Sequence, residues 1–568
     1  MVNAIQTIRC WKCRTLRAAS PPNCWSCGAF LPDRSPPRIF GNIRDTVSPD
    51  LIDLLESNNP PLESEIPSIR AIIADGEEQL EYLDAQIQDM EVTLAQLICR
   101  HREISEHVRQ HHAIISPIRS LPAELMCEIF AAALSSYIPN PLPTTPPHKP
   151  LYLPIPDEEA YSPPWHLAQV CQSWRRYALS YPRLWSSVVV PRISSTNCGA
   201  YNLMNTQLLR SANASLNVHW PNPIPLWLDL MLAHCQRWRT LSISIRYLTS
   251  YGPLDWLQPF KGRFHRLERL SIDNRPSQPL PDIFSTSPNL RHVSLSPKMF
   301  ITYNCHPTPV SLPWGHITHY RGMFAPSKQR RILESAHKLV ECALGFNTSQ
   351  VEVDRAGSPI SLPCLRRLRS ERTTFLSHLT TPTLEHLWAG DTPPQYMPVL
   401  LSFLTRSPCA LQTLVLTDCR ICLGLIPVLE QLPDLTYLFI DSYRKADLYE
   451  ADRDATEGAA IIAVFTAMSM SDARSCLCPR LISMVYGYDF GDGLSRKSFF
   501  NMASSRLNST QNDRVCFQHL RLFNSRERGR PATNHPAVAS VVQLLRDEGL
   551  DAGISDPLEC DRLVERLF

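Results

Sequence analysis

Four cysteines near the start of the chain have the spacing of a metal site. Cys10 and Cys13 form one Cys-x-x-Cys pair, and Cys24 and Cys27 form a second pair ten residues later. Two such thiolate pairs can complete the tetrahedral shell of a structural zinc ion. A segment of about thirty residues buries too little apolar surface to fold alone, so zinc would supply its folding free energy. Residues 1–40 are therefore predicted to form a zinc knuckle or, alternatively, a flexible tail with reduced thiols.

The cysteine spacing resembles that of the small Ran-binding-protein-type zinc finger, some members of which bind RNA. The Trp that this family has two residues before the first Cys is Ile8 here, and the Asn four residues after the second Cys is Arg17. Four thiolates leave no open coordination position, so a zinc ion held in this way would be structural. Nucleic-acid binding through the knuckle remains a lesser alternative for the function.

Motifs of self-contained enzymes are missing from the sequence. It contains no P-loop, GxGxxG, GxSxG or HExxH sequence and no kinase motif set. Its 50 prolines against 19 glycines argue against glycine-rich cofactor loops. We therefore expect a protein without catalytic residues that requires no cofactor beyond the one structural zinc.

Composition describes a large globular chain without a strong charge. The 568 residues should form several structural units, and 56 basic against 54 acidic residues leave a formal charge of only +2. The first residues lack the apolar core of a signal peptide, and the longest nearly apolar run, 459–468, is too short to span a membrane. Most of the 19 cysteines lie singly in apolar patterns. We expect a cytoplasmic or nuclear protein that binds no membrane.

A heptad pattern predicts one long amphipathic helix within residues 41–116. Apolar residues alternate three and four apart, with His101 as the exception, at Leu80, Leu83, Ile87, Met90, Leu94, Leu97, Ile104 and Val108. Flanking positions lack paired opposite charges, and Ile98 widens the apolar stripe. We expect this helix to pack on its own chain in a monomer; a homodimeric coiled coil is the alternative.

Two further amphipathic segments lie within residues 117–190. The first reads PIRSLPAELMCEIF at 117–130 and is expected to place Leu125, Ile129 and Phe130 on one helix face. The second reads HLAQVCQSWRRYALSYPRLWSSVVV at 166–190 and ends its helix at Pro182. Between them, residues 135–164 form a proline-rich insert that should be extended. Both helices require a partner for their apolar faces.

The order Leu-Pro-x-Glu-Leu, Ile-Phe, Val-Cys-x-x-Trp-Arg and Leu-Trp resembles the F-box family, and the wider architecture resembles the F-box-like proteins abundant in mushroom-forming fungi. The resemblance implies a three-helix module that docks on an Skp-type adaptor, which in turn joins it to a cullin ubiquitin ligase. The implied adaptor-binding residues are Leu121, Pro122, Glu124, Leu125, Ile129, Phe130, Val170, Cys171, Trp174, Leu184 and Trp185. Leu184 and Trp185 would also tie the module to the segment that follows.

Short units of the form L-x-x-L-x-L recur through residues 191–568. They begin at Trp238, Leu267, Leu290, Leu365, Leu384, Leu411 and Leu435, with looser copies at Leu339 and Leu481 and a degenerate one at 317–320. Over most of this span the units begin 19 to 29 residues apart, a period typical of leucine-rich repeats, in which each unit contributes a short strand. The predicted fold class is a mixed α+β or α/β solenoid, an irregular horseshoe whose repeat fades after about 500 and which a helix at 538–554 caps.

Together these observations predict a substrate receptor of an Skp–cullin–F-box ubiquitin ligase. The repeats would offer a concave surface to an unknown substrate protein, and the ligase's catalytic cysteine would lie on another chain. Arg366, Arg367, Arg369, Glu371 and Arg372 form a locally basic group that could meet an acidic partner. A protein-interaction scaffold outside any ligase is the alternative function.

Overall fold

A computed structural model describes the chain in segments that fall into two units. The described residues are 7–9, 16–18, 54, 59–135, 163–191, 198–221, 224–245, 254–274, 282–295, 311–346, 357–441, 455–470, 476–488, 493–507, 517–524 and 536–555. One unit comprises Met1–Ser120 and the other Leu121–Phe568.

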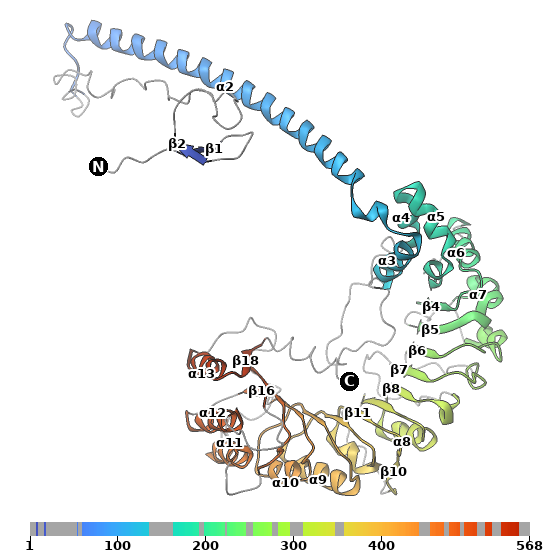
Figure 1. The fold of residues 1–568 in the computed structure, drawn as a ribbon. Coiled ribbons are helices and arrows are strands. Elements are labelled where there is room, and N and C mark those ends of the chain that lie inside the picture. The colour runs from blue at the N-terminus through green and yellow to red at the C-terminus, as the bar shows by residue number, and fades with distance from the viewer. Residues whose placement is uncertain are drawn as a thin grey trace. The chain divides into compact units, whose positions relative to one another are not determined.

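The first unit contains a small strand pair and one very long helix. Strands β1 (Thr7–Arg9) and β2 (Leu16–Ala18) are antiparallel, with Ile8 opposite Arg17. Helix α2 (Ile66–Ile114) runs for 49 residues, carries a proline in its first turn and ends before the 3-10 turn η2 (Pro117–Ser120) (Figure 1). The prediction of one long helix is confirmed, and the helix begins fourteen residues before Leu80, the first residue of the predicted seam.

No side chain of the described helix α2 is buried in the single chain. The apolar residues of the seam are open to solvent, from Leu80 at 61% exposure to Val108 at 48%. On the polar side, Arg100 pairs with Glu103 at 3.0 Å and Arg109 with Glu106 at 2.6 Å. These pairs between neighbouring turns leave the apolar seam uncovered.

The second unit begins with a helical module and continues as a large parallel sheet. The module comprises α3 (Ala123–Ser135), α4 (Pro163–Val170), α5 (Gln172–Ser180) and the 3-10 turn η4 (Pro182–Trp185). Among the described residues, fourteen strands then form one sheet in which the strand order follows the chain order (Figure 1). They are β3 (Ser187–Val189), β4 (Leu216–Trp220), β5 (Trp238–Ile245), β6 (Arg269–Asn274), β7 (His292–Leu295), β8 (His319–Met323), β9 (Glu341–Gly345), β11 (Arg367–Ser370), β13 (His386–Ala389), β14 (Thr413–Leu416), β15 (Tyr437–Asp441), β16 (Ser483–Tyr488), β17 (His519–Asn524) and β18 (Asp551–Ile554).

Each predicted repeat unit from Trp238 to Leu481 supplies one strand of this sheet. The fourth residue of a unit, such as Leu270, Leu368 or Leu414, is buried on the face that the helices cover. Since alternate residues of a strand point to opposite faces, the third and fifth residues lie on the other face of the sheet. The first residue of a unit, such as Leu267 or Leu435, is also fully buried. The apolar pattern therefore fixed the register in which neighbouring strands pair.

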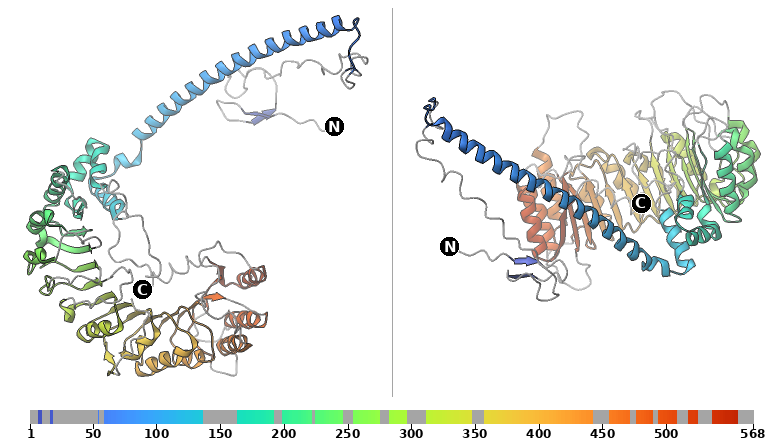
Figure 2. Two further views of the ribbon diagram at one scale, coloured as in Figure 1. Left: turned by 180° about the vertical axis from the view of Figure 1, so that it is seen from behind. Right: turned by 90° about the horizontal axis from the view of Figure 1, so that it is seen from above.

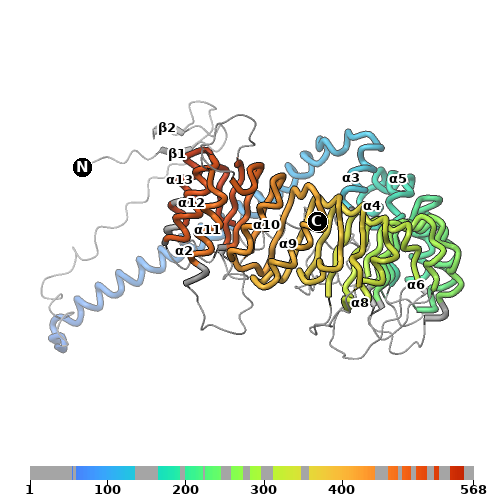
Figure 3. Tube along the Cα trace, turned by 90° about the horizontal axis from the view of Figure 1, so that it is seen from below, coloured from blue at the N-terminus to red at the C-terminus, as the bar shows by residue number. Residues whose placement is uncertain are grey.

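Helices and 3-10 turns connect successive strands and cover one face of the sheet, on the convex side of its arc (Figure 2). In Figure 3 the helices succeed one another along the sheet in chain order, from α6 at one end to α13 at the other. The helices are α6 (Cys198–Arg210), α7 (Leu228–His234), α8 (Pro326–Ser335), α9 (Met397–Arg406), α10 (Leu425–Glu430), α11 (Ala455–Met468), α12 (Gly493–Leu507) and α13 (Pro536–Asp547). The 3-10 turns are η5 (Pro225–Trp227), η6 (Cys235–Arg237), η7 (Leu254–Phe260), η8 (Trp314–His316), η9 (Thr373–His378) and η10 (Pro394–Tyr396). Outside the large sheet, β10 (Ile360–Ser361) and β12 (Leu379–Thr380) form a short parallel pair.

The structure corrects the prediction for the last third of the chain. The regular succession does not fade after 500, because β17 and β18 extend the sheet past β16 in register. The predicted helix over 538–554 is a helix only as far as Asp547, and its last residues form β18. Gly549, with φ at +99°, turns the chain between the two, in a backbone conformation that favours glycine. The degenerate unit at 317–320 also contributes a full strand, β8.

Candidate protein-docking site

The helical module has an apolar core of its own. Met126, Phe130, Ala178, Leu184 and Trp185 are each at most 2% exposed and pack in one cluster, separate from the core of the sheet. Phe130 lies 4.8 Å from Trp174, ring centre to ring centre. Helices α3 and α5 are amphipathic segments with one apolar face each, and this cluster is where those faces meet.

Polar contacts lock the helices of the module together. The Tyr181 hydroxyl donates to Glu128 Oε1 at 2.7 Å, which joins η4 to α3, and this hydrogen bond raises the pKa of Tyr181. Arg175 Nε donates to the carbonyl of Ala168 at 2.9 Å, joining α5 to α4. Trp185 Nε1 donates to the carbonyl of Ala178 at 2.8 Å. The module is thus held by both apolar packing and satisfied hydrogen bonds.

Large apolar side chains also point outward from this module. Leu125 is 53% exposed, Ile129 44% and Val170 60%. Leu125 and Ile129 lie one turn apart on α3, and Val170 ends α4 beside the exposed Cys171, whose sulfur caps α5 by accepting from the Trp174 amide at 3.4 Å. Large exposed apolar side chains on a module that already has its own core are candidates for contact with another protein.

The structure separates the predicted adaptor-binding residues into three groups. The exposed group is Pro122, Glu124, Leu125, Ile129, Val170 and Cys171; the half-buried group is Leu121 and Trp174; the buried group is Phe130, Leu184 and Trp185. The expectation that Phe130 shares a face with Leu125 and Ile129 is wrong. Phe130 follows Ile129 by one residue, about 100° around the helix, and that rotation turns it to the core beside Met126.

Arg210 of α6 connects the module to the sheet. Its guanidinium lies 4.4 Å from the ring centre of Trp165 and 4.6 Å from that of Trp185, and these two rings meet edge-to-face at 5.0 Å. Burial lowers the pKa of Arg210. Gln207, on the same helix, donates to the carbonyl of Ser187 in β3 at 2.8 Å. The module and the first strand therefore form one continuous body.

A row of polar side chains crosses the sheet on the open face, the face opposite the helices. The row consists of the paired residues His292, His319, Glu341, Arg367 and His386. The rings of His292 and His319 stack at 4.0 Å, His319 Nε2 lies 3.7 Å from Glu341 Oε2, and Arg367 pairs with Glu341 at 2.8 Å. Burial and the neighbouring His319 lower the pKa of His292 to about 4, and burial also lowers the pKa of His386. The row therefore carries neutral imidazoles and one ion pair at neutral pH.

Beside this row, the open face becomes apolar. Trp388, Val415, Phe439 and Val485 lie in register on consecutive strands and, with Phe523, form a second buried cluster. Arg369 lies over the Trp388 ring at 4.3 Å. The predicted basic group is thus divided: Arg367 faces the polar row, Arg369 is buried on Trp388, and Arg372 lies 5.5 Å from the Phe346 ring.

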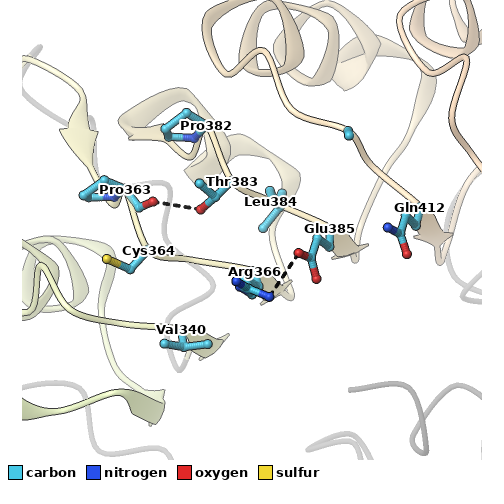
Figure 4. Close-up of a pocket in the computed structure, with 10 residues that line it drawn as sticks. Val340, Pro363, Cys364, Arg366, Pro382, Thr383, Leu384, Glu385 and Gln412 are labelled. Atoms are coloured by element: carbon cyan, nitrogen blue, oxygen red, sulfur yellow. Dashed lines mark hydrogen bonds and ion pairs between the residues drawn. The ribbon is translucent and has the colours of Figure 1, made fainter.

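A pocket of about 590 Å³ lies where strands β11 and β13 begin (Figure 4). Arg366 and Glu385 both line it and form an ion pair at 3.4 Å, and the Thr383 hydroxyl donates to the Pro363 carbonyl at 2.8 Å. Cys364 and Gln412 also line it. The lining combines this ion pair with polar and apolar side chains.

Sequence reasoning missed the polar row, although a signal for it exists. Its members are the third residues of successive units, for example His292 in the unit that begins at Leu290 and His386 in the unit that begins at Leu384. Aligning the units by their buried leucines and reading the third position would have placed these side chains next to one another.

The predicted zinc ligands Cys10, Cys13, Cys24 and Cys27 lie outside the described residues, so the zinc knuckle stays a prediction. Strands β1 and β2 lie on either side of Cys10 and Cys13 in the sequence. Within the part of the chain that the structure describes, no group of three or more His, Cys, Asp or Glu side chains is arranged to hold a metal ion.

Comparison with protein-family models and with curated proteins gave no match for this chain. Over the described segments, no helix combines the length and the apolar character needed to cross a membrane. The long helix α2 is rich in charged residues.

Proposed function

We propose that this chain is the substrate receptor of an Skp–cullin–F-box type ubiquitin ligase. In this proposal the helical module is an F-box that docks on an Skp-type adaptor, and the parallel sheet is a leucine-rich-repeat horseshoe that binds the substrate protein. The observation that carries it is the exposure of Leu125, Ile129 and Val170 on a module whose other apolar side chains fill a core. The F-box-like sequence pattern supports the same assignment of residues.

The docking step follows from ordinary interface physics. Burying exposed leucine, isoleucine and valine side chains against an apolar groove removes their surface from water, at about 25 cal/mol per Å². Glu124 and Pro122 lie at the rim, where polar groups stay solvated. Phe130, Leu184 and Trp185 take part indirectly, because they hold the module's helices in place from inside.

Substrate capture is assigned to the open face of the sheet. Its polar row offers charged and polar contacts, because the side chains of His319, Glu341 and Arg367 are partly exposed there, while the neighbouring apolar cluster is buried and supports the strands that carry the row. The chain then acts by proximity, because it raises the effective concentration of a substrate lysine near the loaded ubiquitin carrier. No residue of this chain takes part in a covalent step.

The test is co-purification of the full chain with an Skp-type adaptor. The variant Leu125→Ala/Ile129→Ala/Val170→Ala removes side chains that are exposed in the free chain, so it should fold normally and lose adaptor affinity on the order of 100-fold. A matched control, Leu203→Ala/Leu209→Ala/Leu544→Ala, truncates equally exposed side chains on α6 and α13 and should bind unchanged. A folded wild-type chain that does not bind the adaptor would refute the ligase role and favour the scaffold.

A further inference from the structure

The apolar seam of α2 is longer than the sequence pattern alone indicated. Because the helix begins at Ile66, the three-and-four spacing continues backward through Gly76, Ile73 and Ile69 to Ile66. The seam then spans residues 66–111 without a break in the helix, interrupted only by Gly76, His101 and His111. At about 1.5 Å per residue, this is a stripe of about 70 Å.

A helix of this kind requires a partner of matching period. Most helical stability in proteins comes from packing of an apolar face, and the two surface ion pairs of α2 contribute little. Apolar residues at a 3.5-residue repeat stay in contact only with another helix that supercoils around them. A second copy of α2 has this repeat over its whole length.

We propose that α2 pairs with α2 of a second copy of this chain as an antiparallel coiled coil. The proposed register places Ile87 opposite Met90 of the second copy. All other layers then follow: Leu83 faces Leu94, Leu80 faces Leu97, Gly76 faces His101, Ile73 faces Ile104, Ile69 faces Val108 and Ile66 faces His111.

The two interior exceptions of the seam complement each other in this register. Gly76, which has no side chain, lies opposite His101, the bulkiest polar residue among the interior layers. A Cβ on Gly76 meets no atom within 4 Å in the single chain, so space for a neighbouring side chain exists there. A parallel pair would instead place Gly76 against Gly76 and His101 against His101, leaving a gap in one layer and two imidazoles in another.

Charge supports the same orientation. Residues 75–84 carry five carboxylates, Asp75, Glu77, Glu78, Glu81 and Asp84, and no basic residue. In the proposed register they face residues 93–102, which carry Arg100 and Arg102 and no acidic residue. A parallel pair would bring the five carboxylates of one copy beside the five of the other, which is repulsive. Asp84 and Glu91 flank the centre and oppose association modestly.

The first test is the mass of the full chain in solution, by sedimentation velocity over a concentration series. We expect a particle of twice the 64.4 kDa chain mass. Leu83→Asp/Leu94→Asp places carboxylates in facing layers and should weaken the dimer at least about 100-fold. The control Gln88→Asp/Gln96→Asp adds the same charge on the outward side of the helix and should leave it a dimer. A wild-type monomer, or a dimer that survives Leu83→Asp/Leu94→Asp, would overturn the proposal.

The second test is the orientation. Arg100→Glu/Arg102→Glu should weaken the dimer about tenfold at low salt. Adding Glu77→Arg/Glu78→Arg/Glu81→Arg to the same chain should restore it, because residues 75–84 then carry three arginines against two carboxylates and face the two new glutamates. In a parallel dimer the arginines face each other, so Arg100→Glu/Arg102→Glu would not weaken it. That result would overturn the antiparallel register. Neither measurement depends on adaptor binding.

Discussion

Arg210 lies with its guanidinium 4.6 Å from the centre of the Trp185 ring, at the boundary between the helical module and the sheet. The same guanidinium covers Trp165 at 4.4 Å. Trp185 is fully buried and Arg210 is half-buried, and this burial lowers the pKa of Arg210. The guanidinium of Arg210, on helix α6 that packs on the sheet, thus contacts two indole rings of the helical module.

Replacing Arg210 by Ala should loosen this boundary. A partly desolvated cation–π contact is worth about 1–2 kcal/mol, so amide hydrogen exchange in β3 should speed up roughly five- to thirtyfold. Arg176→Ala, which removes an exposed arginine 5.4 Å from the Tyr177 ring, is the control and should leave β3 unchanged. Equal exchange in both variants would show that Arg210 does not stabilise the boundary.

Gln329 should be among the most sensitive polar residues of the sheet. It is fully buried on α8, and its Nε2 donates to the carbonyls of Gly322 in β8 at 2.9 Å and Gly345 in β9 at 3.1 Å. Its Oε1 accepts from the Tyr320 hydroxyl at 2.8 Å. Gln329→Leu removes all three of these buried hydrogen bonds, and although the Gly345 carbonyl keeps its bond from the Phe324 amide, the change should cost about 2–4 kcal/mol of unfolding free energy in urea. Tyr320→Phe removes only one of the three bonds and should cost about 1 kcal/mol; equal losses would contradict the bridging role.

The histidines of the polar row should make the free energy of unfolding depend on pH. The pKa of His292 is about 4 in the folded chain, against about 6.5 when unfolded, so the unfolded chain binds the proton more readily. The free energy of unfolding should therefore be highest above pH 6.5 and fall as the pH falls from 6.5 towards 4. His292→Gln should flatten this slope in thermal unfolding measured across that range, whereas His265→Gln, at an exposed position, should not. A slope that His292→Gln leaves intact would assign it to other groups.

Gly487 should not tolerate a side chain. A Cβ there would lie 2.5 Å from the Phe523 ring and 2.9 Å from Asp441 Oδ1, on the buried part of the open face. Gly487→Ala should therefore destabilise by about 1–3 kcal/mol through overpacking. Gly315→Ala meets only the His337 ring, at 3.7 Å, and serves as the control in the same urea titration. A neutral Gly487→Ala would mean that Phe523 moves aside freely.

The parts of the fold that sequence could predict are those that local apolar periodicity determines. The buried apolar residues at positions one and four of each unit, leucine in most of them, identified the strands, and the heptad spacing identified α2. Gln329 could not be recognised, because its partners are backbone carbonyls of two strands and leave no trace in residue type. Phe130 was misplaced because Leu125, Ile129 and Phe130 are all apolar and were grouped by residue type. The helical repeat turns Phe130 about 100° away from Ile129, and its packing against Trp174 places it on the inner side of α3.

The order of the strands in the sheet has a consequence for how the chain can change. Because each strand of the large sheet pairs with its sequence neighbours in the described chain, the contacts between strands are local in sequence. Folding can begin at any two neighbouring strands and their connecting helix and spread outward, because no segments that are distant in sequence need to meet first. For the same reason, gain or loss of one strand together with its connecting helix would lengthen or shorten the sheet without altering the pairing of the remaining strands. Duplication of one strand with its connecting helix would thus extend the open face of the sheet by one strand.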